Sequence, residues 1–414
     1  MKIALVHDYI KEYGGAERVL EALHEIWPDA PVFTTVYLPE FLGPHRKRFE
    51  SWNIKPSFLQ NIPFKAKLIS PIRLIAPWVF RQCDFSKFDV VIVSATGAYS
   101  PNGKWKIENG KSPLHICYCH TPPRYLYGFA TAREWKNNLI FRILGEIANH
   151  FLRLIDFKSA QNVDFFIANS KNVAGRIKKF YRKESTVIYP PVDVARSQPH
   201  ISDDARSAHS KNQSNCRLLS ESRLQSETKS SFSSSESELS PRSYFLAGGR
   251  IARPKHIDLI VETFVKLKLP LKVFGREFGG KSPNILISQY PNIQFLGEVS
   301  DEEKLELMAQ AKAFVFAAED EDFGITPVEA MSVGTPVVSY RSGGVVESVV
   351  DGKTGIFYRF NDLNHLSEAI QRFEKMKFDR EFIIKHAQKF SKERFKKEIK
   401  EFVGSKVKNV NKSS

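Results

Sequence analysis

The feature that most constrains the fold is a repeated alternation of short β-rich runs with helical stretches. In the first part of the chain, residues 2–9, 88–96, 114–121 and 163–170 read as strands, and residues 14–27 read as an amphipathic helix after the first of them. Residues 88–96 are almost continuously apolar, which is typical of a strand covered on both faces. This alternation predicts an α/β fold with a parallel sheet.

A second α/β unit begins after residue 243. Its expected elements are strands at 244–250, 271–275, 293–297, 313–318 and 335–340, helices at 257–267 and 302–311, and a mixed stretch at 343–358. Two such units in tandem predict two Rossmann-like domains that face each other across a cleft.

The two units are separated by a stretch of different composition. Residues 196–243 contain 16 serines in 48 positions and almost no aromatic residue. Such a segment buries too little apolar surface to offset the entropy of ordering it, so we expect a disordered insertion or linker. The expected division is a first domain at 1–193, the Ser-rich insertion at 194–243, a second domain at 244–385, and a C-terminal helix with a basic tail at 386–414.

Hydropathy and cysteine usage narrow the class of protein. No apolar run reaches the roughly 18 residues that a membrane span needs. The apolar start meets His7 and Asp8 too early for a signal peptide and reads as a strand, so we expect a cytoplasmic protein. Cys117, Cys119 and His120 invite a metal site, but along a strand His120 points to the opposite face from the two thiols. Buried small apolar side chains are the favoured role for these cysteines.

The charge balance favours anionic partners. The formal net charge is +15, and residues 381–414 carry ten Lys or Arg against four Glu, a local net of +6. This tail either forms a solvated helix face or contacts an anionic membrane on the cytoplasmic side of the inner membrane. Residues 67–82 mix apolar and basic side chains, and they either form a buried helix or contact a lipid-linked acceptor or the bilayer.

Gly14 and Gly15 lie between the first expected strand and the first expected helix. Backbone N–H groups and the positive end of the helix could approach an anion there, although a turn that needs positive φ explains a glycine equally well. The pattern is not GxGxxG, and the ribose-binding acid expected about 20 residues later is missing, so a nicotinamide cofactor is not expected.

The first strand of the second unit also ends in glycine and is followed by basic residues. Gly248 and Gly249 precede Arg250, and Lys255 follows five residues later, with Arg253 between them as a possible third cation. Two fixed cations at a strand end suit a diphosphate, because they neutralise it and stabilise the charge on a leaving group.

The stretch EDEDFGITPVEAM at 319–331 holds five acidic residues at the start of a helix. Thr326, Pro327 and Glu329 match a capping box, so Glu329 can be a local cap; at the carboxyl end of a strand it can also accept the two hydroxyls of a ribose. Asp320 and Asp322 could hold a divalent metal against a diphosphate. The nearby cations make a metal unnecessary, so we expect no metal.

These motifs together resemble the family 4 glycosyltransferases with the GT-B fold. The resemblance rests on GGAE at 14–17, AGGRIARPKHID at 247–258, EDFGITPVEAM at 321–331 and GTPVVSYRSGGVVE at 334–347, and it spans nearly the whole chain except the Ser-rich insertion. HTPPRYLYG at 120–128 and IYPPVD at 188–193 resemble the bacterial polysaccharide mannosyltransferases of that family. The chain departs from the family pattern at Asp322, where Pro is usual, and at His256, where Gly is usual.

The resemblance implies a role for each motif residue. Glu321 would hold the donor hexose, Glu329 the nucleotide ribose, and Arg250 and Lys255 the diphosphate. His120 would lie near the transferred sugar. The residues that would line the donor are Gly14, Gly15, Gly249, Phe323, Gly324 and Ile325. The terminal helix at 389–403 would cross back to the first domain on an apolar face made by Phe390, Phe395, Ile399 and Phe402.

The implied activity is that of a retaining glycosyltransferase that uses no cofactor. The donor would be a nucleoside-diphosphate hexose such as GDP-mannose, and the acceptor a saccharide or polyprenyl-linked sugar in cell-surface polysaccharide synthesis. Two enzymatic alternatives are a GT-B epimerase and a phosphorylase. A basic nucleic-acid-binding protein is the non-enzymatic alternative, but it leaves the glycine and acid motifs unexplained, so nucleic acid is not an expected partner.

Overall fold

The computed structural model describes residues 1–95, 101–105, 112–131, 139–194, 242–276 and 290–413. Most of the Ser-rich segment, including Cys216, therefore lies outside the described residues, and the disorder predicted for it stays a prediction. We call residues 1–194 the first half and residues 242–391 the second half.

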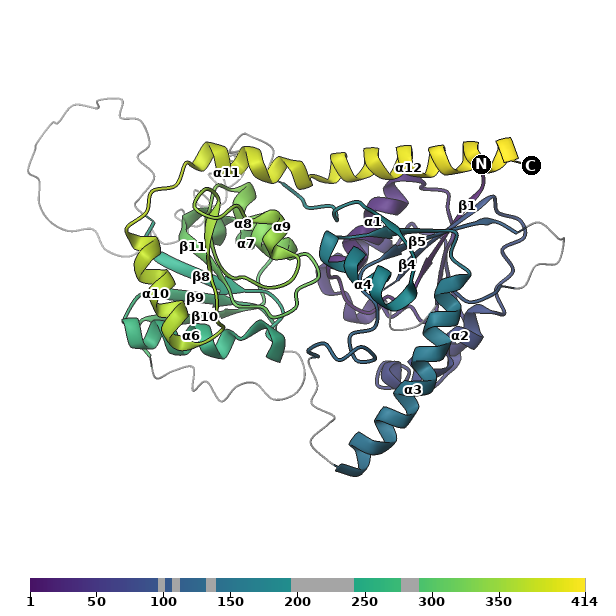
Figure 1. Cartoon of the computed structure of the whole chain (residues 1–414), viewed down its shortest axis with the longest axis horizontal. Coiled ribbons are helices and arrows are strands. Elements are labelled where there is room, and N and C mark those ends of the chain that lie inside the picture. The colour runs from purple at the N-terminus through teal and green to yellow at the C-terminus, as the bar shows by residue number, and fades with distance from the viewer. Residues whose placement is uncertain (96–100, 106–111, 132–138, 195–241, 277–289, 414) are drawn as a thin grey trace, which may run out of the picture. The chain divides into compact units, whose positions relative to one another are not determined.

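The first half is built on a seven-stranded parallel sheet (Figure 1). Its strands are β1 (Ile3–His7), β2 (Val32–Thr34), β3 (Ile54–Pro56), β4 (Val90–Ala95), β5 (Leu114–Cys119), β6 (Phe165–Ala168) and β7 (Ser185–Val187). Their order is β3-β2-β1-β4-β5-β6-β7, so the direction of winding reverses between β1 and β4. Ligands of open α/β sheets bind at the carboxyl ends of strands beside such a reversal.

Helices cover both faces of this sheet. They are α1 (Gly15–Ile26), α2 (Ile69–Phe80), α3 (Leu139–Gln161) and α4 (Lys171–Tyr181), with short 3-10 turns at Pro39–Phe41, Gly43–Phe49 and Phe58–Asn61. Side chains of α2, α4 and the end of α3 share one buried apolar cluster with alternate residues of β1 and β4, whereas α1 packs into a second cluster on the opposite face. The predicted doubly covered sheet is confirmed.

The second half repeats the architecture with a six-stranded parallel sheet. Its strands are β8 (Tyr244–Gly248), β9 (Leu271–Phe274), β10 (Ile293–Gly297), β11 (Ala311–Phe316), β12 (Val337–Tyr340) and β13 (Gly355–Tyr358), in the order β10-β9-β8-β11-β12-β13. Its helices are α6 (Ile257–Leu267), α7 (Asp301–Gln310), α8 (Ile325–Ser332), α9 (Val345–Ser348), α10 (Leu363–Glu374) and α11 (Arg380–Ala387), with 3-10 turns η4 (Arg253–Lys255) and η5 (Gln388–Phe390). Here the winding reverses between β8 and β11.

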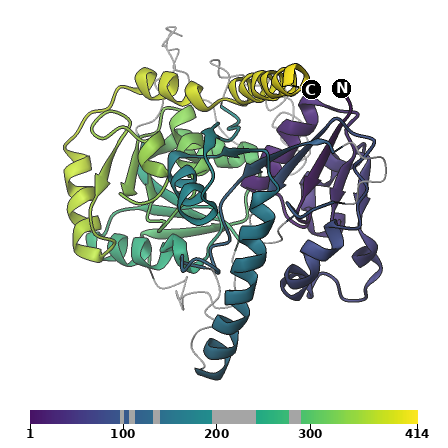
Figure 2. The ribbon, with the colours of Figure 1, turned by 45° about the vertical axis from the view of Figure 1, so that its right-hand side comes forward.

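The last helix, α12 (Lys392–Ser413), returns to the first half as predicted (Figures 1 and 2). Phe390, expected on its apolar face, instead lies in the η5 turn before it and packs in a buried cluster of the second half. Phe395, Ile399 and Val403 are buried in the same apolar cluster as the inner side of α1. Lys396 Nζ lies 3.1 Å from Glu25 Oε2 on α1, and Lys392 pairs with the same carboxylate. Burial alone would raise the pKa of the Glu25 carboxyl. Its hydrogen bonds to the two lysines outweigh burial and lower that pKa.

The apolar face of the tail is therefore used inside the protein. Phe395 and Ile399 are no more than 1% exposed, so this apolar face is not open to solvent. Contact of the basic tail with an anionic membrane stays a prediction. Within residues 67–82 the helix α2 forms, as the buried-helix alternative expects for its inner face, and contact with a lipid-linked acceptor or the bilayer stays a prediction. Ile72 and Val79 on α2 are buried, whereas Trp78 is 56% exposed.

Cys117 and Cys119 are buried in the apolar cluster beneath α2, and burial raises the pKa of both thiols. Among the described helices, none is both long and apolar enough to cross a membrane.

Candidate active site

The predicted phosphate-binding residues meet at the carboxyl ends of β8 and β11, where the winding of the second sheet reverses. After β8, Gly249 has a φ of +113°, and a Cβ on Gly248 would lie 2.4 Å from the Phe274 carbonyl oxygen. The chain can make this turn only with glycine, which brings Arg250 and the η4 turn to the sheet edge. The loop 319–324 follows β11 directly.

Lys255 and Glu321 form the centre of this edge. Lys255 Nζ lies 2.6 Å from Glu321 Oε2, and the two side chains are 25% and 21% exposed. Burial alone would raise the pKa of Glu321, but the charges of Lys255 and Arg124 outweigh it and lower that pKa. The structure thus keeps Glu321 ionised beside a cation, which suits a group that accepts hydroxyl hydrogen bonds near a diphosphate.

The loop that carries Glu321 depends on two glycines of the GTPVVSYRSGGVVE stretch at 334–347. A Cβ on Gly343 would lie 2.2 Å from the Glu321 carbonyl oxygen, and a Cβ on Gly344 would lie 2.2 Å from that of Asp322. The Gly344 N–H donates to the Glu321 carbonyl at 2.7 Å. The two glycines therefore let the segment after β12 contact the acid loop backbone and fix its path.

Arg250 points toward the first half. Its Nη2 lies 2.7 Å from Glu12 Oε1, in the loop before α1, and it would lie 3.8 Å from a Cβ on Gly14. The predicted glycine pair and the predicted cation are thus neighbours. The side chain of Arg250 is 44% exposed, so its ion pair with Glu12 is open to exchange with a ligand.

Helix α8 begins two residues earlier than the predicted capping box implies. Its first residue is Ile325, and Gly324, with a φ of +89°, occupies the cap position without a side-chain bond. The expected capping box of Thr326 and Glu329 is therefore wrong, because a glycine in the left-handed region already turns the chain into the helix. The Glu329 carboxylate instead binds two cations.

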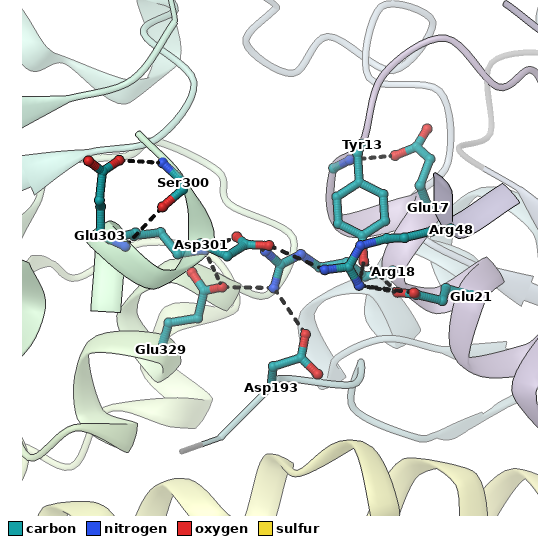
Figure 3. A network of polar contacts seen from close by, with 12 residues as sticks. Tyr13, Glu17, Arg18, Glu21, Arg48, Asp193, Ser300, Asp301, Glu303 and Glu329 are labelled. Carbon is teal, nitrogen blue, oxygen red and sulfur yellow. Dashed lines mark hydrogen bonds and ion pairs between the residues drawn. The ribbon is translucent and has the colours of Figure 1, made fainter. Parts of the chain in front are cut away.

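Glu329 belongs to an ion-pair network that joins both halves (Figure 3). Its Oε1 lies 2.8 Å from Arg18 Nη1 on α1 and 2.9 Å from Lys304 Nζ on α7. Arg18 also contacts Asp301 at 3.2 Å. The Glu329 side chain is 5% exposed, and although burial raises its pKa, Arg18 and Lys304 outweigh burial and lower it.

Asp320 and Asp322 of the EDEDFGITPVEAM stretch also contact the first half. Asp322 lies 2.9 Å from Arg124 Nη2 and 2.8 Å from Arg176 Nη1. The Asp320 carbonyl accepts from both guanidinium groups, at 2.9 and 3.2 Å. Asp322, which departs from the family pattern, thus forms a bidentate contact with two arginines of the first half.

No group of three or more His, Cys, Asp or Glu within the described ranges is placed to hold a metal ion. This placement does not test the predicted absence of a metal, because the donor's own oxygens would complete such a site.

His120 follows β5 at the carboxyl edge of the first sheet. Its Nε2 lies 2.9 Å from Ser94 Oγ, whose other neighbour is His7 Nδ1 at 3.2 Å. Burial, with His7 adding to it, lowers the pKa of His120 to about 3. Burial also opposes the charge on His7, but the Glu17 carboxylate, 3.7 Å from His7 Nε2, outweighs burial and raises that pKa. His120 is thus a neutral imidazole beside a more basic one.

The other predicted donor residues lie on both sides of the same region. A Cβ on Gly15 would lie 3.0 Å from Ile325 Cδ1, so the first turns of α1 and α8 are in contact. The Phe323 ring is 2% exposed and packs on Tyr189 and Phe390, so only its backbone is available to a ligand. The contacts described here do not link His120 directly to Glu321, and that proximity stays a prediction.

Two family models match this chain. Residues 13–196 match Glycosyltransferase Family 4, and residues 230–393 match the Glycosyl transferases group 1. The chain is a family 4 glycosyltransferase. It has the GT-B fold, and the resemblance predicted from GGAE and EDFGITPVEAM is confirmed.

Individual relatives of this glycosyltransferase are distant. An α-1,3/1,6-mannosyltransferase ALG2 of Rhizomucor pusillus is 24% identical over 331 residues, which cover 74% of this chain and 68% of that protein. The human ALG2 is 34% identical over 149 residues, which cover 31% of this chain and 36% of that protein. The crystal structure of Anabaena Alr3699/HepE in complex with UDP has a TM-score of 0.61 at 15% identity and covers 98% of this chain and 100% of that one.

Sequence reasoning missed the first-half partners of the glycosyltransferase motifs. Arg18 directly follows GGAE and Arg124 lies within HTPPRYLYG, so both stood beside quoted motifs. Arg176 lies on α4 in a run of unremarkable basic residues, and no local signal marks it. Glu17, whose Oε2 accepts the Gly14 N–H at 2.9 Å, could have been found as the acid of GGAE.

Proposed function

We propose that this glycosyltransferase transfers a hexose, mannose in the first instance, from a nucleoside diphosphate to a saccharide or lipid-linked acceptor in cell-surface polysaccharide synthesis. The observation that carries the proposal is the convergence of Lys255, Glu321 and Arg250 at one strand-end reversal, with Glu329 on the adjoining helix. The names of the ALG2 relatives support mannose, and the UDP in the Anabaena structure supports a nucleoside-diphosphate donor.

In this proposal the two carboxylates divide the donor between them. Glu321, held by Lys255, accepts hydroxyl hydrogen bonds from the hexose. Both cations of Glu329 contact Oε1, so Oε2 is the oxygen that we assign to the ribose hydroxyls. Binding the ribose in this way leaves the contact with Arg18 intact.

The cations act on the leaving group. When the bond between the anomeric carbon and the phosphate oxygen breaks, its electron pair passes to the diphosphate, and Arg250 and Lys255 stabilise the added charge. The acceptor oxygen then bonds to the anomeric carbon from the same face and gives its proton to the departing phosphate, which retains the configuration. We propose that the cations suffice and that no metal takes part. The neutral His120 would donate or accept one hydrogen bond at the sugar.

A donor panel tests the proposal. Purified protein is offered sugar nucleotides of different bases and hexoses, with saccharide and polyprenyl-linked acceptors, and nucleoside diphosphate release is measured with and without EDTA. We expect release from a mannose donor, GDP-mannose first, that EDTA does not affect. If no donor is bound or turned over, the transferase assignment fails, and loss of activity in EDTA would assign a metal to Asp320 and Asp322.

The panel also separates the enzymatic alternatives. An epimerase would convert the sugar nucleotide without an acceptor, and a phosphorylase would need inorganic phosphate. Neither alternative is favoured by an observation in the described structure.

A further inference from the structure

A second surface of the first half has no part in donor binding. Six large apolar side chains of α3 are between 38% and 61% exposed to solvent: Ile143, Leu144, Ile147, Phe151, Leu154 and Ile155. Their spacing of three and four residues places them on one stripe of the helix. Single exposed apolar residues are ordinary in soluble proteins, but a continuous stripe along a helix marks a contact surface.

The opposite side of α3 packs against the rest of the first half and is hydrogen-bonded to it. Asp156 is buried and accepts a hydrogen bond from the Tyr127 hydroxyl at 2.9 Å, and Arg153 donates to the Leu126 carbonyl at 2.9 Å. The end of the helix contributes Ala160 to the buried cluster under the sheet. The stripe is thus the outer face of a helix whose inner face is already used. In both ribbon views the first turns of α3 extend away from the first sheet (Figures 1 and 2).

The polar residues beside the stripe are mainly basic. Arg142, His150 and Lys158 are exposed next to it. Among the α3 side chains that the structure describes, the acids are Glu146, which lies 3.8 Å from Arg153, and the buried Asp156. An apolar stripe with basic edges is the pattern of a helix that lies in the interface of an anionic bilayer.

A second apolar group lies on the same side of the sheet. Phe58, Phe64 and Trp78 are 51%, 78% and 56% exposed, and the rings of Phe58 and Trp78 lie 6.0 Å apart. Trp78 belongs to α2, whose inner face shares its buried cluster with the end of α3. Tryptophan is enriched at membrane–water interfaces, so this group suits the same kind of contact.

We propose that the exposed stripe of α3 docks the protein on an anionic lipid bilayer, with the Phe58–Trp78 group as a second contact. The charges favour this occupant over a second copy of the chain, because pairing two α3 stripes would bring Arg142, His150 and Lys158 of both copies together. The benefit of docking, which is access to a lipid-linked acceptor, rests on the proposed function; the docking itself does not.

Vesicle flotation of the full chain tests the surface. The variant carries Ile147→Ser and Phe151→Ser, which remove the centre of the stripe without touching a buried group, and the control carries Phe360→Ser, which changes a side chain of the second half that is 51% exposed. We expect the wild type and the control to float with phosphatidylcholine vesicles that contain phosphatidylglycerol, and less with pure phosphatidylcholine. Partition of the double variant should fall by about tenfold or more, because two apolar side chains no longer leave water.

Three results would overturn the proposal: no flotation of the wild type, equal flotation of the variant and the control, or a wild-type dimer in light scattering that the variant converts to a monomer. Binding of nucleotide sugars is also measured without vesicles, so that failure of the docking proposal can be told apart from failure of the proposed function. If the protein binds donor but does not float, only the docking proposal is refuted. If it floats but binds no donor, only the proposed activity is refuted.

Discussion

Glu321 and Glu329 are both ionised carboxylates of the second half, but the protein holds them in different ways. Glu321 lies on a loop shaped by Gly343 and Gly344, and its cation, Lys255, comes from the same half. Glu329 lies on a helix, is only 5% exposed, and takes one of its two cations, Arg18, from the first half. The difference indicates that Glu321 is held by contacts within its own half, whereas Glu329 also couples the two halves.

The largest expected effect comes from neutralising the cation beside Glu321. Lys255→Met should lower kcat by about 100- to 1,000-fold, because the leaving diphosphate loses a charge that is aimed at it. Steady-state kinetics with the donor identified by the panel measures this change. Lys312→Met is the matched control, since Lys312 forms an ordinary pair with Glu374 at 3.0 Å in the same half. Similar losses in both variants would remove Lys255 from the site.

The loop that carries Glu321 should be more sensitive to backbone crowding than an open helical position. Gly344→Ala places a Cβ 2.2 Å from a carbonyl oxygen, so we expect a loss of about 1–3 kcal/mol in the free energy of unfolding. Chemical denaturation measures it, and Gly175→Ala, which meets nothing within 4 Å on α4, should be neutral or stabilising. A Gly344→Ala protein of unchanged stability would contradict the close packing of this loop.

The coupling energy within each ion pair should also differ between Glu329 and Glu321. We expect a double-mutant cycle of Arg18→Met and Glu329→Gln to give about 1–2 kcal/mol in unfolding free energy, because this pair is well buried. The cycle of Lys255→Met and Glu321→Gln should give less, since its partners are 25% and 21% exposed. A larger value for the second pair would reverse the assignment of Glu329 as the coupling residue.

The smallest effect is a dependence of stability on pH. The pKa of both carboxyls is lowered below the ordinary value of 4.5, so each binds a proton more readily in the unfolded chain than in the folded one. Their contribution to stability is present above pH 4.5 and is lost as the pH falls from there through the lowered folded-state values.

Thermal unfolding across that pH range should show a shallower fall for Glu329→Gln than for the wild type. Glu368→Gln, which changes a carboxyl of α10, should keep the full fall. An identical slope for the wild type and Glu329→Gln would contradict the linkage.

Much of this arrangement could be predicted from local sequence. The helix at 257–267 and the strand at 293–297 agree with the structure at both ends, because apolar periodicity and flanking glycine or proline define them. The short strands β2, β3 and β7 were missed, since three residues carry no periodicity. Helix α3 was missed as well, because its apolar residues face both inward and outward and so weaken the amphipathic pattern.

The contacts of the candidate site residues divide in the same way. Lys255 and Glu321 lie in motifs that the sequence singled out, and they are in contact. Arg124 and Arg176 reach Asp322 from positions 198 and 146 residues away in the chain, beyond any local pattern. The sequence around Glu329 matches a capping box, but its carboxylate binds cations that are distant in the chain. The capping interpretation was therefore wrong. Spacing alone cannot distinguish a carboxylate that binds its own helix from one that binds Arg18 on another element.

Equilibrium binding of the donor and of its nucleoside diphosphate tests the division of roles most directly. Calorimetry is run with the wild type, Glu321→Gln and Glu329→Gln. Our account predicts that Glu329→Gln weakens both ligands by a similar factor, about tenfold, because the ribose is common to both. Glu321→Gln should weaken the sugar nucleotide and leave the diphosphate unchanged. Equal losses of diphosphate binding in the two variants would contradict the assignment of Glu321 to the sugar and Glu329 to the ribose.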